Sequence, residues 1–354
     1  MTYTGSIILI LIYAVMVIIL LWRVWYLWRK ITSAHHTPTL SRHVSPIHTS
    51  GARVFFSRPI AAILHTVLVA AMILMTTYSI GEVYGVKNHI WDTVAYISAA
   101  SAIIAAIIFI TRRCISHISR FSTLTPTQTA DAYTILSLEI ISGATLIASQ
   151  YDVYGFHTAH YITLMLFAIY ITYSKHLHII TAWLYMMINR HRGAYDTERV
   201  SGVCMMMDIM EGKTSATDVS CNTMGSNSCR ELSRLDILGV YSCSQCGRCV
   251  ELCPPHIVGE DFSPMETNIR IKKAIGKKTP FYPDAIDDDF ISKCISCGAC
   301  VAACPIGLNP MKLLWEVKRY AYLEKGYIPS SYHTASQSTQ NSQYPLPTHL
   351  DYKK

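Results

Sequence analysis

Residues 243–254 read Cys-Ser-Gln-Cys-Gly-Arg-Cys-Val-Glu-Leu-Cys-Pro, and residues 294–305 read Cys-Ile-Ser-Cys-Gly-Ala-Cys-Val-Ala-Ala-Cys-Pro. Both stretches follow the pattern Cys-x-x-Cys-x-x-Cys-x-x-x-Cys-Pro, and together they use eight of the 12 cysteines in the chain. Three cysteines at three-residue steps let one tight loop reach three corners of an iron–sulfur cubane. The pattern therefore predicts two [4Fe–4S] clusters.

In domains of this kind, the fourth cysteine of each run ligates the other cluster. The predicted ligands of one cluster are Cys243, Cys246, Cys249 and Cys304. The predicted ligands of the second are Cys294, Cys297, Cys300 and Cys253. Gly247 and Gly298 are expected where the backbone passes close to the clusters. Disulfides would need an oxidising compartment, and zinc sites usually show two separate Cys-x-x-Cys pairs.

The first half of the chain has the composition of a membrane protein. Of the 354 residues, 51% are hydrophobic and only 15% are charged, which is unusual for a soluble protein. Apolar stretches of about the twenty residues that a bilayer requires occur at residues 6–25, 59–80, 93–110, 132–149 and 160–187. The sequence therefore predicts five membrane spans.

Basic residues orient the predicted spans. They gather in the loops after the first and third spans and just after the fifth, where Arg112, Arg113, Arg120, Arg190 and Arg192 lie. The two opposite loops hold only Lys87. The positive-inside rule then predicts a multi-pass protein of the cytoplasmic (inner) membrane, with its N-terminus outside and the cysteine runs in the cytoplasm. These loops account for the net charge of +7, and no basic–aromatic patch indicates nucleic acid as a partner.

Histidines within the predicted spans point to haem. Histidines inside a bilayer are costly and tend to be functional, and paired histidines on facing helices are a natural b-type haem site. In a continuous fifth span, His160 and His178 would share a face and His176 would point almost oppositely. We predict that His65 and His178 are the axial ligands of one haem near the cytoplasmic side, with His176 as a reserve ligand.

A second haem at the outer end is an open alternative. It would use His160 together with Met72 or Met75, because thioether ligation of haem does occur. Two other polar residues within the predicted spans each have two possible roles. Glu139 is either a proton relay to a quinone or a neutral core residue. Lys175 either snorkels to the inner surface or pairs with a haem propionate.

Residues 173–178, Tyr-Ser-Lys-His-Leu-His, resemble the last-helix motif of membrane subunits related to the gamma subunit of respiratory nitrate reductase. The stretch from Arg58 through His65 resembles the first haem helix of that family. The resemblance implies a five-helix, quinone-reactive haem b bundle with its N-terminus outside. Family members carry two histidines on each haem helix, whereas this sequence has only His65 on the second span.

Residues 235–329 resemble the C subunit of heterodisulfide reductase and the matching part of its fused D-type relatives. The resemblance is carried by the two cysteine runs and by Glu-Lys-Gly-Tyr-Ile-Pro at residues 324–329. It implies an α-helical ferredoxin with two clusters. The spacer agrees, because residues 263–266, Ser-Pro-Met-Glu, read as a helix start, and we expect that helix to end at Gly276.

Fused relatives continue into cysteine-rich CCG domains that do the catalytic or flavoprotein-linked chemistry. This sequence contains no Cys-Cys-Gly. The resemblance therefore implies a separate cytoplasmic redox subunit, either a protein with CCG domains or a flavoprotein.

The predicted fold class is all-α: a five-helix transmembrane haem b bundle (residues 1–192), a linker (193–234), a dicluster α-helical ferredoxin (235–329) and a disordered tail (330–354). Cys204, Cys221 and Cys229 in the linker lack a compact motif and are interpreted as free thiols. The tail is rich in Ser, Thr, Gln and Pro, which cannot build a core.

These patterns favour a membrane-bound electron-transfer subunit of a quinone-linked oxidoreductase, with electrons moving between a cytoplasmic partner and membrane quinone in either direction. One alternative is a haem-free bundle that merely anchors a ferredoxin. A second alternative is a membrane assembly or redox-sensing protein.

Overall fold

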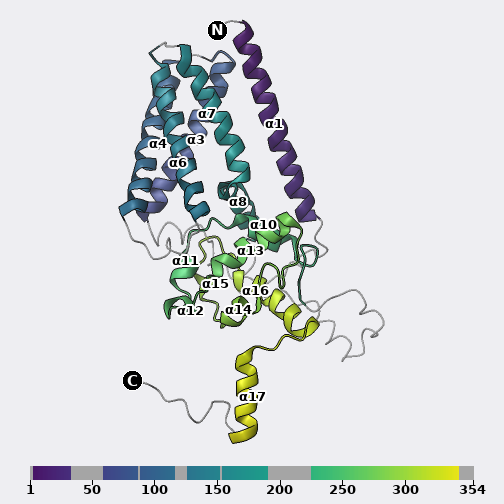
Figure 1. Ribbon diagram of the computed structural model, residues 1–354. Helices are drawn as coiled ribbons and strands as arrows, with labels where there is room; N and C mark the ends of the chain where they lie inside the picture. Colours follow the sequence, from purple (N-terminus) through teal and green to yellow (C-terminus); the bar gives the residue numbers. More distant parts are fainter. Residues whose placement is uncertain are drawn as a thin grey trace.

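The computed structural model describes residues 3–32, 59–86, 88–115, 126–151, 154–189 and 225–342. Every regular element within these ranges is helical, and none is a β-strand. The helices form two parts, a bundle of long helices and a compact domain of shorter ones at one end of it (Figure 1). The mostly helical fold class predicted from the sequence is thus confirmed.

The bundle contains α1 (Tyr3–Thr32), α3 (Pro59–Val83), α4 (His89–Ile115), α6 (Pro126–Ser149) and α7 (Tyr154–Tyr173). Helices α3, α4, α6 and α7 pack side by side in chain order, and α1 packs on α7 (Figure 1). Three helices are long and apolar enough to cross a membrane, namely Pro59–Glu82, His89–Ile115 and Thr129–Ser149. They correspond to the second, third and fourth predicted spans.

The bundle interior combines small and polar residues with a few large ones such as Met75 and Leu146, and many large apolar side chains face outward. Ala95, Ala99 and Ala102 are buried on α4, and a Cβ on Gly143 of α6 would lie only 3.1 Å from the carbonyl oxygen of Ala99. Ile97 of α4, by contrast, is 65% exposed. Close helix contact through small residues, with branched apolar side chains turned outward, is the arrangement expected in lipid.

The predicted fifth span is not one continuous helix. After α7, Ser174 takes an extended conformation, a 3₁₀ turn covers Lys175–Leu177, and α8 begins anew at His178–Asn189. The hydroxyl of Ser174 accepts a hydrogen bond from the backbone N–H of His176 at 3.1 Å, which caps the turn. The helical-phase argument that turned His176 away from His178 is therefore wrong, because their ring centroids lie 6.0 Å apart.

The second part is built from short helices around two cysteine loops. They are α10 (Arg234–Ser242), α11 (Arg248–Glu251), α12 (Pro254–Ile257), α13 (Pro264–Lys277), α14 (Asp288–Lys293), α15 (Ala299–Ala303), α16 (Pro310–Arg319) and a π-helical turn (Tyr320–Glu324). Helix α13 contacts α10, α11 and α16 and begins at Pro264 as predicted. It continues past Gly276 and ends where Lys278 adopts a left-handed conformation (φ 60°).

An apolar core unites this part and extends into the bundle. Ile237, Ile271, Phe281 and Leu314 are fully buried in it, and Leu27 of α1 belongs to the same cluster. Full burial of one such side chain contributes about 1.5–3 kcal/mol. The helical domain and the end of α1 are therefore one packed unit.

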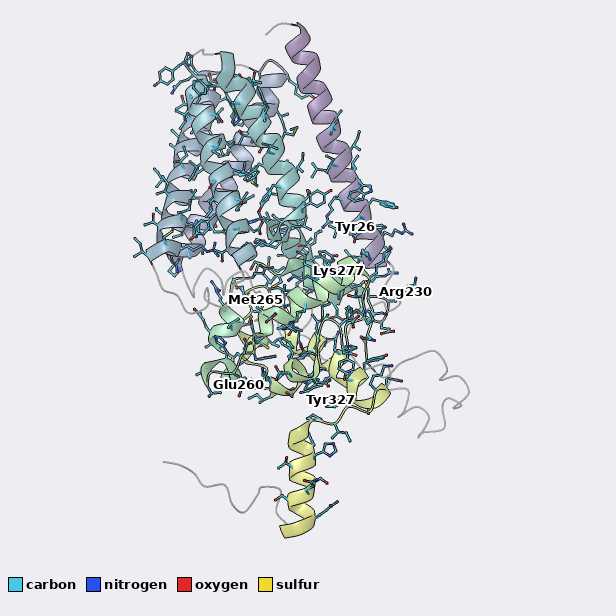
Figure 2. All side chains as sticks on the ribbon, viewed as in Figure 1. Tyr26, Arg230, Glu260, Met265, Lys277 and Tyr327 are labelled. Atoms are coloured by element: carbon cyan, nitrogen blue, oxygen red, sulfur yellow. The ribbon has the colours of Figure 1, made fainter. Side chains whose placement is uncertain are left out.

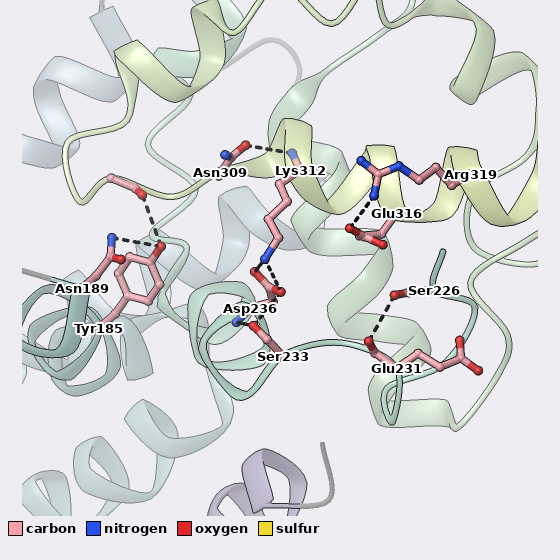
Figure 3. Close-up of polar contacts among 11 residues, drawn as sticks. Tyr185, Asn189, Ser226, Glu231, Ser233, Asp236, Asn309, Lys312, Glu316 and Arg319 are labelled. Atoms are coloured by element: carbon pink, nitrogen blue, oxygen red, sulfur yellow. Dashed lines mark hydrogen bonds and ion pairs between the residues drawn. The ribbon is translucent and has the colours of Figure 1, made fainter. Parts of the chain in front are cut away.

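Helices α10 and α16 are also joined by polar contacts (Figure 3). The ammonium of Lys312 lies 2.8 Å from the carboxylate of Asp236, and the hydroxyl of Ser233 donates to the same carboxylate at 2.7 Å. Ser233 also caps α10 by accepting from the backbone N–H of Asp236. This group fixes how the helix before the first cysteine run meets the helix after the second.

The predicted disordered tail is helical where the structure describes it. Residues Ser330–Ser342 form α17, which projects away from the rest of the molecule (Figure 1). The polar composition of the tail indicated that it has no apolar face. In agreement, most described side chains of α17 are exposed. The structure thus has a helix at residues where the sequence predicted disorder. Residues 343–354 lie outside the described ranges.

Candidate metal centres

The two cysteine loops share one backbone conformation. They belong to the domain of short helices that carries the labelled Glu260 and Met265 in Figure 2. Gln245 and Gly247 have positive φ angles of 56° and 75°, and Ser296 and Gly298 have 59° and 78° at the matching places. Two left-handed residues within four positions curl each loop tightly, and only glycine adopts such angles freely. The two runs are thus two copies of one loop as well as one sequence pattern.

The loops cross over, so that each fourth cysteine meets the opposite loop. Cys249 interacts most strongly with Cys243, Cys246 and Cys304, with Cys300 after them. We call Cys243, Cys246, Cys249 and Cys304 the proximal group. Cys304 belongs to the second run in sequence, yet it lies with the first run in space.

The other four cysteines form a matching set. Cys300 has Cys294, Cys253 and Cys297 as its neighbours, and Cys253 in turn interacts with Cys294 and Cys297. We call Cys294, Cys297, Cys300 and Cys253 the distal group. The structure therefore brings the eight cysteines together in the two sets that the sequence pattern suggests.

The chemistry of these thiols fits metal ligands. Burial raises the pKa of Cys243 to about 11, and burial raises the pKa of Cys304 to about 12, with neighbouring cysteines adding to both shifts. Backbone N–H groups point at the sulfurs, as in the 3.2 Å hydrogen bond from Leu308 N to Cys304 Sγ. Four such thiols become thiolates together only when cations neutralise them.

Within the described ranges, no three His, Cys, Asp or Glu side chains converge closely enough to hold one metal ion.

The distal group lines a cavity that also contains an unpaired hydroxyl. Phe262, Pro264 and Thr267 of the chain around α13 complete the wall beside the four cysteines. Thr267 is only 1% exposed, and its Oγ1 has no hydrogen-bond partner among the residues that the structure describes. A buried hydroxyl without a partner is costly, so this donor fits a sulfide of a bound cluster. The spacing of the cysteines alone did not indicate Thr267.

The proximal group packs against the bundle. Cys243 and Cys304 border a cluster of buried apolar residues that includes Tyr185 of α8 and Leu308. On the same helix, Thr181 Oγ1 donates to the carbonyl oxygen of Tyr241 at 3.0 Å. Tyr241 precedes Cys243 by two residues. A short path of bonds therefore joins α8 to a cysteine of the proximal group.

The distal group reaches the surface at Cys297, which is exposed. Large apolar side chains near its cysteines in the sequence are more than half exposed, namely Leu252, Ile257, Val258 and Ile295. Exposed apolar residues gathered in one place often mark an interaction site.

His65 of α3 and His178 of α8 meet near the proximal group. Their ring centroids lie 6.5 Å apart, and the ring planes differ by only 9°. Imidazole nitrogens bind metals at about 2.0 Å, so two imidazoles on opposite sides of one iron have centroids about 6–6.5 Å apart. His178 Nδ1 lies 2.8 Å from the Lys175 carbonyl oxygen. That oxygen can only accept, so Nδ1 of His178 carries the hydrogen in this contact and Nε2 carries the lone pair.

The other two predicted haem residues are placed differently. His176 Nδ1 lies 3.3 Å from Ser174 Oγ and 3.9 Å from a carboxylate oxygen of Asp131. His160 is 2% exposed, with Nε2 2.9 Å from Ser79 Oγ and Nδ1 2.9 Å from the Ser142 carbonyl oxygen. Both nitrogens of His160 thus have protein partners, and Ser79 occupies the side where a metal would bind.

Of the three linker cysteines, Cys229 lies within the described residues. Cys229 is partly buried and packs against the main core. Cys204 and Cys221 lie outside the described residues.

Comparisons with known proteins agree with this geometry. Residues 242–308 match the family model described as a 4Fe-4S dicluster domain. The matched stretch contains both cysteine runs and is similar to a 4Fe-4S dicluster domain. No solved structure matches the chain.

Curated relatives cover more of the chain, at low identity. The probable iron-sulfur-binding oxidoreductase FadF of Bacillus subtilis is 21% identical over 52% of this chain and 30% of its own length. The D subunit of the dihydromethanophenazine:CoB–CoM heterodisulfide reductase of Methanosarcina mazei is 26% identical over 28% of each chain. EtfAB:quinone oxidoreductase of Syntrophomonas wolfei is 22% identical over 35% of this chain and 22% of its own. The chain thus spans less than a third of the length of each of these relatives.

Proposed function

We propose that this chain is a membrane-bound electron-transfer subunit of a quinone-linked oxidoreductase complex. The proposal is carried by one observation: the proximal cysteine group packs on α8, the helix that carries His178. A site for an iron–sulfur cluster and a histidine pair of the right separation for haem therefore share one short stretch of structure. Relatives named as iron–sulfur and quinone oxidoreductases support the same class of function.

The proximal and distal groups would each hold one [4Fe–4S] cluster, and His65 with His178 would hold one haem b. These groups supply one-electron redox chemistry when bound. The protein positions them and excludes water. Backbone N–H groups directed at cysteine sulfur, such as that of Leu308, stabilise the more negative, reduced state.

Three cationic side chains support a haem at this level. Lys272 of α13 interacts electrostatically with Cys243 and Arg23 and with His178, and its ammonium lies 5.4 Å from the ring centroid of Tyr241. Lys175 lies in the same turn as His176. Such a group of cations suits the two propionates of a haem, and it would orient that haem between the bundle and the proximal group.

The soluble partner would dock at the distal group. Cys297 is the most open of the eight cysteines, and the apolar rim around it is unpartnered among the described residues. A separate redox subunit, with CCG domains or a flavin, would exchange electrons there. The quinone would react at the bundle, in whichever direction the potentials of the two partners dictate.

The decisive experiment uses the full chain purified without oxygen. We expect about eight irons per chain for two clusters and, in a reduced-minus-oxidised optical spectrum, the α-band of a b-type haem. His65→Ala and His178→Ala should each remove that band while the electron paramagnetic resonance of both clusters persists. His160→Asn is the matched control and should retain the haem.

Two outcomes would contradict the proposal. A wild-type protein with a full complement of cluster iron and no α-band would leave only the membrane-anchored ferredoxin. Loss of the band in His160→Asn but not in His65→Ala would place the haem elsewhere. Reduction of the clusters by a quinol analogue in reconstituted membranes would favour electron transfer over the redox-sensing alternative.

A further inference from the structure

Polar side chains gather in the half of the bundle that is remote from the cysteine groups. They lie between α3, α6 and α7, whereas the neighbouring interior of α4 is lined by alanines. The members are Ser79, Glu82, Glu139, Ser142, His157, His160 and Tyr161. We call these residues the polar column. None of them has a role in the function proposed above.

His160 forms the centre of the polar column. Its Nδ1 must carry hydrogen, because the carbonyl oxygen of Ser142 at 2.9 Å can only accept. Its Nε2 faces the hydroxyl of Ser79 at 2.9 Å. His160 therefore lies between α3 and α6, with Ser79 on one side and the Ser142 carbonyl oxygen on the other. The Ser79 hydroxyl, which also donates to the Met75 carbonyl oxygen at 2.8 Å, and the imidazole are the two groups here that can exchange protons.

The remote end of the column opens to solvent. Tyr161 Oη donates to Glu82 Oε2 at 3.0 Å, and His157 Nδ1 lies 3.5 Å from Glu82 Oε1. The side chains of His157 and Glu82 are 36% and 24% exposed. Protons from the surrounding water therefore reach the carboxylate of Glu82 directly.

The inner end of the column stops at Glu139 in the middle of α6. Glu139 is 1% exposed, and its Oε1 has no partner among the described residues. The hydroxyl oxygen of Ser142, one turn away on the same face, is likewise buried and unpaired within those residues. Residues spaced i, i+3 on a helix have Cβ atoms about 5–6 Å apart. At that spacing, one water molecule can bridge Glu139 Oε1 and Ser142 Oγ.

We propose that Glu139 is the inner terminus of a proton path that enters at Glu82 and His157 and passes His160. This inference rests on the proposed function, since quinone chemistry takes up or releases one proton for each electron. The path itself moves no electrons. A proton taken from water at the remote end is held on the Glu139 carboxyl and returns by the same groups when the carboxylate reforms. A buried carboxyl inside a membrane bundle costs free energy, and ionisable residues at such places usually have a function.

The test follows the carboxyl of Glu139 by infrared spectroscopy on the full chain in lipid nanodiscs. We expect a protonated-carboxyl band that shifts after transfer to D₂O, that is absent in Glu139→Gln and that is retained at a new frequency in Glu139→Asp. Ser79→Ala and His160→Phe should slow the D₂O shift by about a hundredfold, the scale of one positioned proton-transfer group. Ser98→Ala, a buried serine on α4 outside the column, should exchange like the wild type.

The proposal fails if Glu139→Gln leaves the carboxyl bands unchanged. It also fails if the Glu139 carboxyl exchanges with D₂O as fast in Ser79→Ala as in Ser98→Ala. This comparison stays valid even if His160→Phe does not fold. Haem and cluster spectra recorded on the same samples report the proposed function separately, because the exchange of the Glu139 carboxyl does not require either group.

Discussion

At the scale of single residues, the clearest feature is the unequal surroundings of the two cysteine groups. The distal cavity contains the hydroxyl of Thr267, unpaired within the described ranges, whereas the proximal group packs against apolar Met265 and Ile269 of the same helix. Hydrogen bonds to cluster sulfur raise the potential of an iron–sulfur cluster by stabilising its reduced state. Helix α13 therefore presents a hydroxyl to the distal group and apolar side chains to the proximal group.

Thr267→Val removes this hydroxyl and nearly keeps the side-chain volume. A hydrogen bond to a charged acceptor contributes about 1.5–3 kcal/mol, so we expect the midpoint potential of one cluster to fall by tens of millivolts. Redox titration followed by electron paramagnetic resonance measures both clusters at once. Thr267→Ser should retain the wild-type value, and equal shifts of both clusters would contradict the assignment.

The residues that we propose as metal ligands were the most predictable part of the candidate site. The Cys-x-x-Cys spacing specifies a loop of fixed curvature, and the predicted pairing of His65 with His178 places two residues together that the structure also brings together. Thr267 and the contact of Thr181 with Tyr241 were not predicted. Both depend on how helices distant in sequence pack, which no local pattern encodes.

At the scale of elements, the break between α7 and α8 was missed for a physical reason. Apolar residues continue through positions 160–187, so hydropathy indicates one span. The single hydroxyl of Ser174, which caps a 3₁₀ turn, interrupts it. The helix start at Pro264 was predictable because proline favours the first turn, whereas the end at Lys278 depends on a left-handed residue that the sequence does not announce.

The contact of α10 with α16 makes a prediction about stability. Asp236→Ala leaves Lys312, which is largely buried, without its carboxylate, and it also removes the acceptor of the Ser233 hydroxyl. Losing the partner of a buried polar group costs about 1–3 kcal/mol. We expect a lower midpoint for thermal bleaching of the cluster absorbance.

Glu316→Gln is the control for this change. Glu316 pairs with Arg319 three residues along the same helix, and such pairs contribute only about 0.2–0.5 kcal/mol. A loss of thermal stability as large as that of Asp236→Ala would show that the contact between the helices is not what stabilises the domain.

At the scale of the whole molecule, the proposed electron transfer between the two parts would depend on how closely α8 lies on α10. Gly239 of α10 is a point of close approach, since a Cβ there would lie 3.1 Å from Tyr185 Cε2 and 3.3 Å from Leu308 Cδ2. Composition showed that one part is apolar and the other holds the cysteines. It did not show that they meet through a glycine.

Gly239→Val should push the two parts apart at a cost of about 1–3 kcal/mol, the usual penalty of overpacking. We expect both clusters to remain and the reduction of the bundle by pre-reduced clusters to slow in stopped-flow spectra. Gly276→Val is the control, because nothing lies within 4 Å of a Cβ at that helical position. Wild-type rates in Gly239→Val would mean that α8 and α10 do not form the connection.

The unequal cover of the cysteines also determines how the protein is damaged by air. Cys297 is exposed, while the other seven cysteines of the two groups are buried or half-buried. If the two groups hold clusters as proposed, dioxygen would attack the distal cluster first and remove the iron bound to Cys297. A briefly aerated sample would then keep the proximal cluster, retain about half of its iron and no longer exchange electrons with the soluble partner.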